Sequence, residues 1–163
     1  MGSGKSAVGR RTAKILGIDF TDSDQIIVQD AGVSIAEIFE LAGEEKFREM
    51  EFKSIAKLVL SKPQIIATGG GAFCRAQTAN ILLTHGHVVW LKAPPETLLA
   101  RISNIKSRPL LNNADPLAML KKLNKERTKH YQKAQIHLDT DRLSTRKATM
   151  ALLRTLDTHL SRH

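Results

Sequence analysis

The sequence predicts an α/β fold with a parallel β-sheet, and three observations lead to this prediction. Short apolar runs alternate with longer amphipathic segments along the chain, which is the order of strands and helices around a parallel sheet. Residues 64–68 and 87–91 are nearly all apolar, as strands buried on both faces are. Polar or glycine-rich motifs at residues 22–24 and 69–71 follow predicted strands, at the sheet edge where such folds bind ligands.

Length and composition indicate a single domain over residues 1–163. No apolar run reaches the roughly 18 residues of a membrane span, and no signal peptide precedes the first motif. The single cysteine, Cys74, excludes an internal disulfide and is typical of a reducing cytoplasm. We therefore expect a cytoplasmic protein without a membrane segment.

The formal net charge of +9 lies entirely in the second half of the chain. Residues 1–80 hold ten basic and ten acidic side chains, so residues 81–163 carry the whole excess. A solvated basic surface is one interpretation, and attraction of small anionic substrates is a sharper one. A nucleic-acid partner is not expected, because aromatic side chains for base stacking and known binding motifs are missing.

The first half of the chain predicts mostly helices. An amphipathic helix ends at Gly17, and a short strand follows at residues 18–21. Ser34 and Glu37 form a capping-box pattern that begins a helix. Gly43 breaks this helix, and a longer one follows it. Its apolar positions are Phe47, Met50, Ile55, Leu58 and Val59.

In the second half, Pro94-Pro95 begins a helix that is expected to reach about Ser103. Residues 104–115 are polar and basic. Asp115-Pro116 is an N-cap followed by proline at the first helical position, and the helix runs to about Tyr131. A short strand is predicted at residues 136–139. The closing amphipathic helix carries Met150, Leu152, Leu153, Leu156 and Leu160.

Residues 2–6, Gly-Ser-Gly-Lys-Ser, match the end of the phosphate-binding pattern G-x-x-x-x-G-K-[ST]. Its glycines let backbone N–H groups surround phosphate oxygens, its lysine (Lys5) reaches the β- and γ-phosphates, and its serine (Ser6) ligates Mg²⁺. The first glycine of the pattern and the strand before it are absent. Met-Gly-Ser is also a common start of an expression tag, but that origin does not explain Lys5, Ser6 or the helix behind them.

Asp22 and Asp24 place two carboxylates after the first predicted strand. One can hold Mg²⁺ through water while the other faces a substrate hydroxyl. The alternative is structural, with Asp24 as the N-cap of the next helix. Three successive glycines, Gly69, Gly70 and Gly71, favour a loop that faces a ligand, because a plain turn needs fewer.

Arg48, Arg108 and Arg127 are the candidate anion-binding arginines, since a guanidinium binds carboxylate or phosphate bidentately. Arg108 lies beside Pro109, which stiffens its loop, and Glu126-Arg127 shares a helix face with Tyr131. The histidines lack metal-ligand spacing with Cys74 or with one another. We therefore predict no zinc site.

Taken together, these segments resemble the shikimate kinase family of small phosphate-loop kinases. The matching pieces, in the family's order and at its spacing, are residues 2–6, Asp22-Ser23-Asp24, residues 43–48 (Gly-Glu-Glu-Lys-Phe-Arg), residues 67–71 (Ala-Thr-Gly-Gly-Gly), Arg108-Pro109-Leu110-Leu111, and Glu126-Arg127 with Tyr131. The resemblance implies the P-loop NTPase fold, a three-layer α/β/α arrangement like that of nucleoside monophosphate kinases. It also implies transfer of the ATP γ-phosphate to the 3-hydroxyl of shikimate.

The resemblance assigns an ATP side and a metal site. ATP would be bound by Gly2, Ser3, Gly4, Lys5, Ser6, Ala7 and Arg108, with Arg142 as a weaker match near the adenine. Ser6 and Asp22 would serve Mg²⁺, the implied cofactor. Arg108 would lie on a lid at about residues 104–115.

The resemblance also assigns a shikimate side within a helical region at about residues 24–60. Asp24 would hydrogen-bond the substrate hydroxyls and act as the base, so Lys5, Asp24 and Arg108 are the expected catalytic residues. Arg48 and Arg127 would bind the substrate carboxylate. The loop of Gly69, Gly70 and Gly71 would add a backbone N–H from Gly70.

Three alternatives stay open at this point. One is another phosphate-loop kinase, of the gluconate type. A second is an inactive homologue that acts as a binding protein, because the phosphate pattern is cut. The third is a basic nucleic-acid binder. ATP and shikimate are otherwise the only expected partners, and the family is typically monomeric.

The cut phosphate pattern leads to an expectation about the start of the chain. Members of the family often carry a methionine inside this loop, so we expect the native protein to begin about ten residues upstream of Met1. The missing piece would include the central strand of the sheet.

Overall fold

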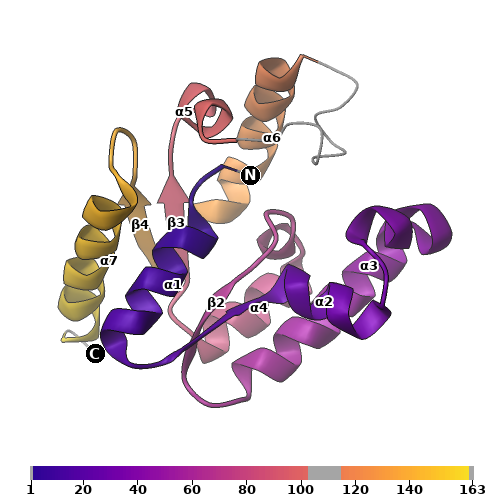
Figure 1. Ribbon diagram of the computed structural model, residues 1–163, viewed down its shortest axis with the longest axis horizontal. Helices are drawn as coiled ribbons and strands as arrows, with labels where there is room; N and C mark the ends of the chain where they lie inside the picture. Colours follow the sequence, from indigo (N-terminus) through magenta and orange to yellow (C-terminus); the bar gives the residue numbers. More distant parts are fainter. Residues whose placement is uncertain (1, 103–114, 162–163) are drawn as a thin grey trace. The chain divides into compact units, whose positions relative to one another are not determined.

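The computed structural model describes residues 2–102 and 115–161. They form two compact units, one made of residues 2–12 with 88–102 and 115–161, and the other of residues 13–87. The units are described separately below (Figure 1). Helix α1 (Lys5–Leu16) begins in the first and ends in the second.

In the unit of residues 13–87, strands β1 (Asp19–Asp22) and β2 (Gln64–Ala67) pair in parallel, with Asp22 opposite Ala67. Around them lie α2 (Ser23–Ala31), α3 (Ile35–Val59), the short 3₁₀ helix η1 (Ala72–Cys74) and α4 (Ala76–His85). A core of Ile27, Ile38 and Phe47 joins α2 to both halves of α3. Asp22 thus ends β1, and Asp24 and Gly69–Gly71 follow the carboxyl ends of the two paired strands.

Local sequence signals explain the shape of α3. Ser34 and Glu37 form the predicted capping box, in which each side chain binds the backbone N–H of the other. Gly43 has φ 78° and ψ 173°, so it interrupts the helix as expected. The second half of α3 therefore begins at Glu44, and it carries Arg48 and Glu51.

In the other unit, strands β3 (Val89–Lys92) and β4 (Ile136–Asp139) pair in parallel. Its helices are the start of α1, α5 (Pro95–Ala100), α6 (Pro116–Tyr131) and α7 (Thr145–Leu160). Val8 of α1, Leu138 of β4, and Ala148 and Leu152 of α7 form its buried core. Helices α1 and α7 therefore pack against one face of this sheet, which fixes the start of α1 next to the strands (Figure 1).

Most predicted elements are present, and the differences are local. The strand predicted at residues 136–139 and the Asp115 N-cap with Pro116 are found as predicted. Strand β3 begins at Val89, two residues later than predicted. Helix α5 ends at Ala100, and the side chain of the next residue, Arg101, binds the loop after β4. Helices η1 and α4 were not predicted from the sequence.

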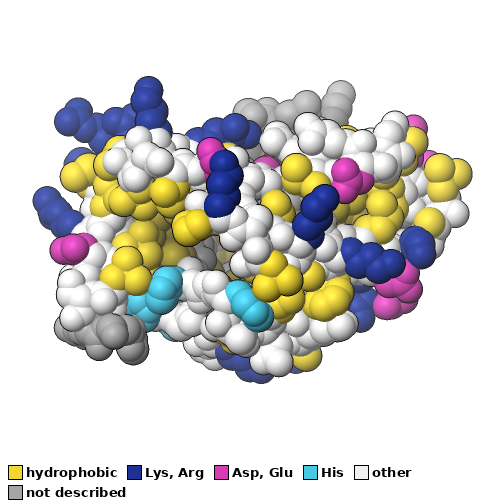
Figure 2. Space-filling model, turned by 90° about the horizontal axis from the view of Figure 1, so that it is seen from below, with side chains coloured by type: hydrophobic (Ala, Val, Ile, Leu, Met, Phe, Trp, Pro, Cys, Tyr) yellow, Lys and Arg dark blue, Asp and Glu magenta, His cyan; other side chains and the backbone are white. Residues whose placement is uncertain are grey.

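The predicted lid at residues 104–115, with Arg108, lies outside the described residues except for Asp115. Among the helices that are described, none combines the length and the apolar character needed to cross a bilayer. On the face drawn in Figure 2, Lys and Arg side chains occur singly or in small groups separated by apolar and neutral surface.

Candidate functional site

The phosphate-loop residues lie at the start of α1. Gly2 and Gly4 have φ values of 70° and 81°, in the left-handed region that favours glycine. Gly2 also lies so close to the carbonyl oxygen of Leu98 on α5 that a Cβ atom would overlap it. Helix α1 begins at Lys5, and its first turn contains no acidic side chain. The N–H groups of a first helical turn point along the helix axis, and together with the helix dipole they make such a terminus favourable for phosphate.

At the end of β1, the two aspartates have different surroundings. Asp22 is the N-cap of α2, because its Oδ1 accepts a hydrogen bond from the backbone N–H of Asp24 at 3.2 Å. The interpretation of Asp24 as the N-cap was therefore wrong. Asp24 lies in the first turn of α2, half-buried, with its carboxylate directed at Gly69.

Gly69 lies between two carboxylates. A Cβ atom at this position would lie 2.9 Å from Oδ1 of Asp24 and 2.9 Å from Oε1 of Glu51. The two oxygens therefore lie no more than twice that distance apart. Only glycine leaves room for both carboxylates to approach this backbone.

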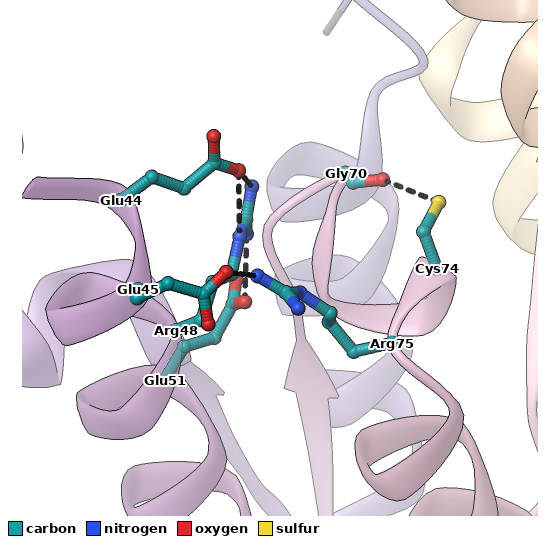
Figure 3. Close-up of polar contacts among 7 residues, drawn as sticks. All are labelled: Glu44, Glu45, Arg48, Glu51, Gly70, Cys74 and Arg75. Carbon is teal, nitrogen blue, oxygen red and sulfur yellow. Dashed lines mark hydrogen bonds and ion pairs between the residues drawn. The ribbon is translucent and has the colours of Figure 1, made fainter.

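Arg48 donates three side-chain hydrogen bonds to two carboxylates. Its Nη1 donates to Oε2 of Glu51 at 2.7 Å, and its Nε and Nη2 donate to Oε1 of Glu44 at 3.3 and 3.1 Å (Figure 3). Its guanidinium lies on Gly71, where a Cβ atom would be 2.5 Å from Nη2 and 2.7 Å from Nη1. These contacts fix the guanidinium next to the glycine loop.

Glu51 is a site residue that the sequence analysis missed. It is 1% exposed, and its Oε1 has no hydrogen-bond partner among the residues that the structure describes. Burial raises the pKa of Glu51, the bond to Arg48 offsets part of this, and the charge of Asp24 raises it further. One sequence signal could have found it. Glu51 lies four residues after Phe47 and four before Ile55, on the buried stripe of α3.

The charge of Arg48 is secured by its two partners. Burial lowers the pKa of Arg48, but the hydrogen bonds and charges of Glu51 and Glu44 raise it, and the net direction is upward. A second pair lies next to it, in which Arg75 binds Glu45 (Figure 3). Cys74 Sγ donates to the carbonyl oxygen of Gly70 at 3.9 Å.

Arg127 and Arg142 belong to the other unit. Arg127 lies half-buried on α6. Arg142 has φ 54° and a side chain that is 94% exposed, in the loop between β4 and α7. Arg101, not singled out in the sequence, donates to the carbonyl oxygens of Thr140 at 2.6 Å and Leu143 at 3.4 Å. Arg101 therefore holds the loop that carries Arg142.

The structure thus brings together one part of the predicted site. Asp24 and Glu51 approach Gly69, and Arg48, which binds Glu51, lies against Gly71, so these residues form one cluster after the ends of β1 and β2. Lys5, Ser6, Arg127 and Arg142 lie in the unit that contains β3 and β4. Within the described ranges, no group of three or more His, Cys, Asp or Glu side chains is placed to hold a metal ion.

Comparison with known proteins identifies relatives over nearly the whole chain. The family model described as "Shikimate kinase" matches residues 1–157. The shikimate kinase of Caulobacter vibrioides is 42% identical over 156 residues, which cover 96% of this chain and 78% of that protein. A solved shikimate kinase from Acinetobacter baumannii, in complex with shikimate, has a TM-score of 0.93 at 36% identity. The match covers 98% of this chain and 89% of the Acinetobacter chain.

A gluconokinase from Sinorhizobium meliloti is a more distant structural neighbour. Its TM-score is 0.57 at 17% identity, and the match covers 100% of this chain and 93% of the gluconokinase chain. That likeness shows a shared fold only. The comparisons confirm both the predicted P-loop NTPase fold and the resemblance on which the predicted activity rested.

Proposed function

The chain belongs to the shikimate kinase family, and we propose that it transfers the γ-phosphate of ATP to the 3-hydroxyl of shikimate. The observation that carries this proposal is the group of Arg48, Asp24 and the glycine loop. It offers a fixed cation for a carboxylate and an acceptor for a hydroxyl in one cluster. A substrate with a carboxylate and hydroxyls on one ring fits that pattern.

On the acceptor side, Arg48 binds the substrate carboxylate, and Arg127 is proposed as its second cation. Charge-assisted hydrogen bonds stabilise by about 1.5–3 kcal/mol each, so two arginines account for much of the binding of a small anion. The backbone N–H of Gly70, between Gly69 and Gly71, adds a neutral donor. Asp24 orients the hydroxyls and accepts the proton of the 3-hydroxyl while the new P–O bond forms.

On the ATP side, the backbone of Gly2, Ser3, Gly4 and Ala7 surrounds the phosphates, and Lys5 neutralises the charge on the transferred group. Phosphoryl transfer depends on such positioning and neutralisation more than on covalent chemistry. Arg108, in the proposed lid of residues 104–115, and Arg142 are the further ATP-side arginines. The lid would exclude water, so that the phosphate reaches shikimate.

Mg²⁺ is the proposed cofactor, held by the hydroxyl of Ser6 and, through water, by Asp22. Asp22 suits this role, because its Oδ1 already accepts a backbone N–H, which orients the carboxylate at the strand end. Mg²⁺ typically keeps several waters and binds substrate phosphates, so few protein ligands are needed. Bound Mg²⁺ would neutralise charge on the β- and γ-phosphates.

We further propose that residues 1–163 act as one kinase domain, with the acceptor region at about residues 24–60. The protein is expected to work as a monomer in the cytoplasm. Its partners are small anions, and the basic second half of the chain would attract them.

Turnover with defined acceptors tests the proposal. ADP release is measured with ATP, Mg²⁺ and either shikimate or gluconate, and the product is identified by mass spectrometry. We expect ADP release that depends on shikimate and a product heavier by one phosphoryl group. Lys5→Ala should abolish both. Turnover of gluconate but not shikimate would contradict the assignment, and nucleotide binding without any turnover would favour the inactive homologue.

A further inference from the structure

Both bidentate edges of the Arg48 guanidinium are already in contact with carboxylates. A guanidinium can hold a carboxylate along its Nε/Nη2 edge or along its Nη1/Nη2 edge. Glu44 accepts from Nε and Nη2, and Glu51 accepts from Nη1 (Figure 3). One face of the group lies on Gly71. An incoming carboxylate therefore meets an arginine whose preferred donors are in use.

The two carboxylates differ in how easily they can leave. Glu51 is 1% exposed and 2.7 Å from its donor, while the side chain of Glu44 is 61% exposed and shares one oxygen between donors at 3.1 and 3.3 Å. Solvent can hydrate Glu44 as soon as it leaves Arg48, whereas Glu51 would become an unpaired buried charge. Glu44 is thus the exchangeable partner.

The backbone before Glu44 is also interrupted. Gly43 has φ 78° and ψ 173°, so Glu44 begins the second half of α3. As the first residue after a break, Glu44 is anchored by fewer helix hydrogen bonds than a residue in mid-helix. Its side chain can turn away while Glu51 and Gly71 still hold Arg48, which lies one turn further along the helix.

We propose that Glu44 is an internal competitor for the substrate carboxylate. It occupies the Nε/Nη2 edge of Arg48 in the free protein and is displaced when the substrate binds. The inference rests on the proposed function, in which Arg48 binds the carboxylate of shikimate. It assigns to Glu44 the role of setting acceptor affinity, with Glu51 as the permanent partner that keeps Arg48 in place.

The expected effect is moderate. The apparent affinity for shikimate equals the intrinsic affinity multiplied by the fraction of protein in which Arg48 is not blocked by Glu44. Partly exposed ion pairs of this kind correspond to about a two- to five-fold change in a binding constant. Removing the Glu44 carboxylate should therefore tighten shikimate binding by that factor.

The chain offers a matched control in the next residue. Glu45 carries the same charge and is 81% exposed, but it pairs with Arg75 instead of Arg48. Glu45→Gln therefore removes one negative charge from the same helical turn and leaves the Arg48 edge occupied.

The experiment measures shikimate binding by titration calorimetry for the wild type, Glu44→Gln, Glu44→Ala and Glu45→Gln, with thermal unfolding as a check on folding. We expect about two- to five-fold tighter binding for both Glu44 variants and little change for Glu45→Gln. The methyl ester of shikimate, which lacks the charge, should bind the wild type and the Glu44 variants equally.

Other outcomes would overturn the inference. Unchanged or weaker binding in the Glu44 variants means that Glu44 does not compete, and weaker binding would make it a positioning residue. An equal gain of shikimate affinity in Glu45→Gln would show that the effect comes from the loss of a nearby negative charge and not from the release of Arg48. A wild type that neither binds nor phosphorylates shikimate would overturn the proposed function, and the inference with it. A wild type that binds shikimate without a gain in Glu44→Gln would overturn the inference alone.

Discussion

Glu51 accepts a hydrogen bond from Nη1 of Arg48 at 2.7 Å, and only 1% of its side chain is exposed while 18% of the arginine is. The proposed substrate-binding cation is thus held by a carboxylate that solvent barely reaches. Three residues after Arg48 on the same helix, Glu51 also approaches Gly69, next to Asp24. A single buried group therefore contacts Arg48, the proposed carboxylate-binding residue, and lies near Asp24, the proposed hydroxyl-binding residue.

Arg48→Lys should weaken shikimate binding by roughly ten- to a hundred-fold, which corresponds to the loss of one charge-assisted hydrogen bond. Lysine keeps the charge but loses the planar fork that contacts Glu51, Glu44 and Gly71 together. ATP binding should change by less than about two-fold. Calorimetry with each ligand measures the two effects.

Arg75→Lys is the matched control for this prediction, because it makes the same chemical change at an arginine that pairs with Glu45. It should leave shikimate binding close to that of the wild type. Equal losses of shikimate and ATP binding in Arg48→Lys would contradict the assignment of Arg48 to the acceptor side.

Glu51→Gln should alter how stability depends on pH. The pKa of Glu51 is raised above 4.5 in the folded protein, mainly by burial. The folded state therefore binds a proton more tightly than the unfolded state, and this contribution to stability is present at low pH and lost as the pH rises through the folded pKa. The wild type therefore loses stability as Glu51 ionises above pH 4.5. Glutamine does not ionise, so the free energy of unfolding of Glu51→Gln should rise relative to that of the wild type from pH 4.5 upward.

Urea unfolding across this range measures the difference, and Glu49→Gln provides a control of opposite sign. Glu49 is exposed and bound to Lys46, and these bonds lower its pKa. Its contribution is present above the unfolded pKa and lost as the pH falls. A difference for Glu51→Gln that does not vary with pH would contradict a raised pKa.

Gly71→Ala should weaken shikimate binding without lowering the stability of the fold. Gly71 has φ −92° and ψ −20°, which alanine adopts without strain. The new Cβ atom would, however, meet the guanidinium of Arg48 at 2.5–2.8 Å, so the end of that side chain must move. We expect shikimate KM to rise about ten-fold, the loss of roughly one charge-assisted bond, with a melting temperature close to that of the wild type.

Gly86→Ala is a useful comparison, because its Cβ atom would meet only the carbonyl oxygen of Leu82, at 3.4 Å. It should leave KM unchanged. A large fall in melting temperature for Gly71→Ala with an unchanged KM would show that the glycine serves folding and not the position of Arg48.

Local signals in the sequence predicted the elements that depend on near neighbours. The capping box of Ser34 and Glu37, the break at Gly43 and the strand at Ile136–Asp139 were all predicted. Each of these depends on residues a few positions apart, so the sequence displays it directly. The end of α5 was predicted less well. The helix stops at Ala100, and the next residue, Arg101, binds Thr140, which lies far away in the sequence.

The same distinction applies to the site. Asp24, Arg48 and the glycine loop were recognised by motif, but Glu51 was not, because its role follows from burial against Gly69 and Arg48. Glu44 was part of a motif, yet its contact with Arg48 depends on how α3 resumes after Gly43. Side-chain contacts across a helix turn depend on rotamers and exposure, which a sequence pattern does not specify.

Gly2→Ala should damage the phosphate loop more than an ordinary glycine substitution would. Gly2 has φ 70°, and its Cβ atom would overlap the carbonyl oxygen of Leu98, a backbone atom that cannot turn aside. Gly17→Ala is the control, because Gly17 has φ 67° with nothing within 4 Å of the added atom. Gly17→Ala should lower the free energy of unfolding by about 1–2 kcal/mol, the cost of an alanine in the left-handed conformation. It should leave ATP binding intact.

For Gly2→Ala we expect a similar or larger loss of stability together with at least about a ten-fold loss of ATP affinity, because the loop must move away from α5. Nucleotide titration and urea unfolding of both variants test this. If Gly2→Ala and Gly17→Ala lose stability equally and both bind ATP normally, the approach of Gly2 to Leu98 does not matter for the nucleotide. If only Gly2→Ala loses ATP, the contact with α5 sets the shape of the phosphate loop.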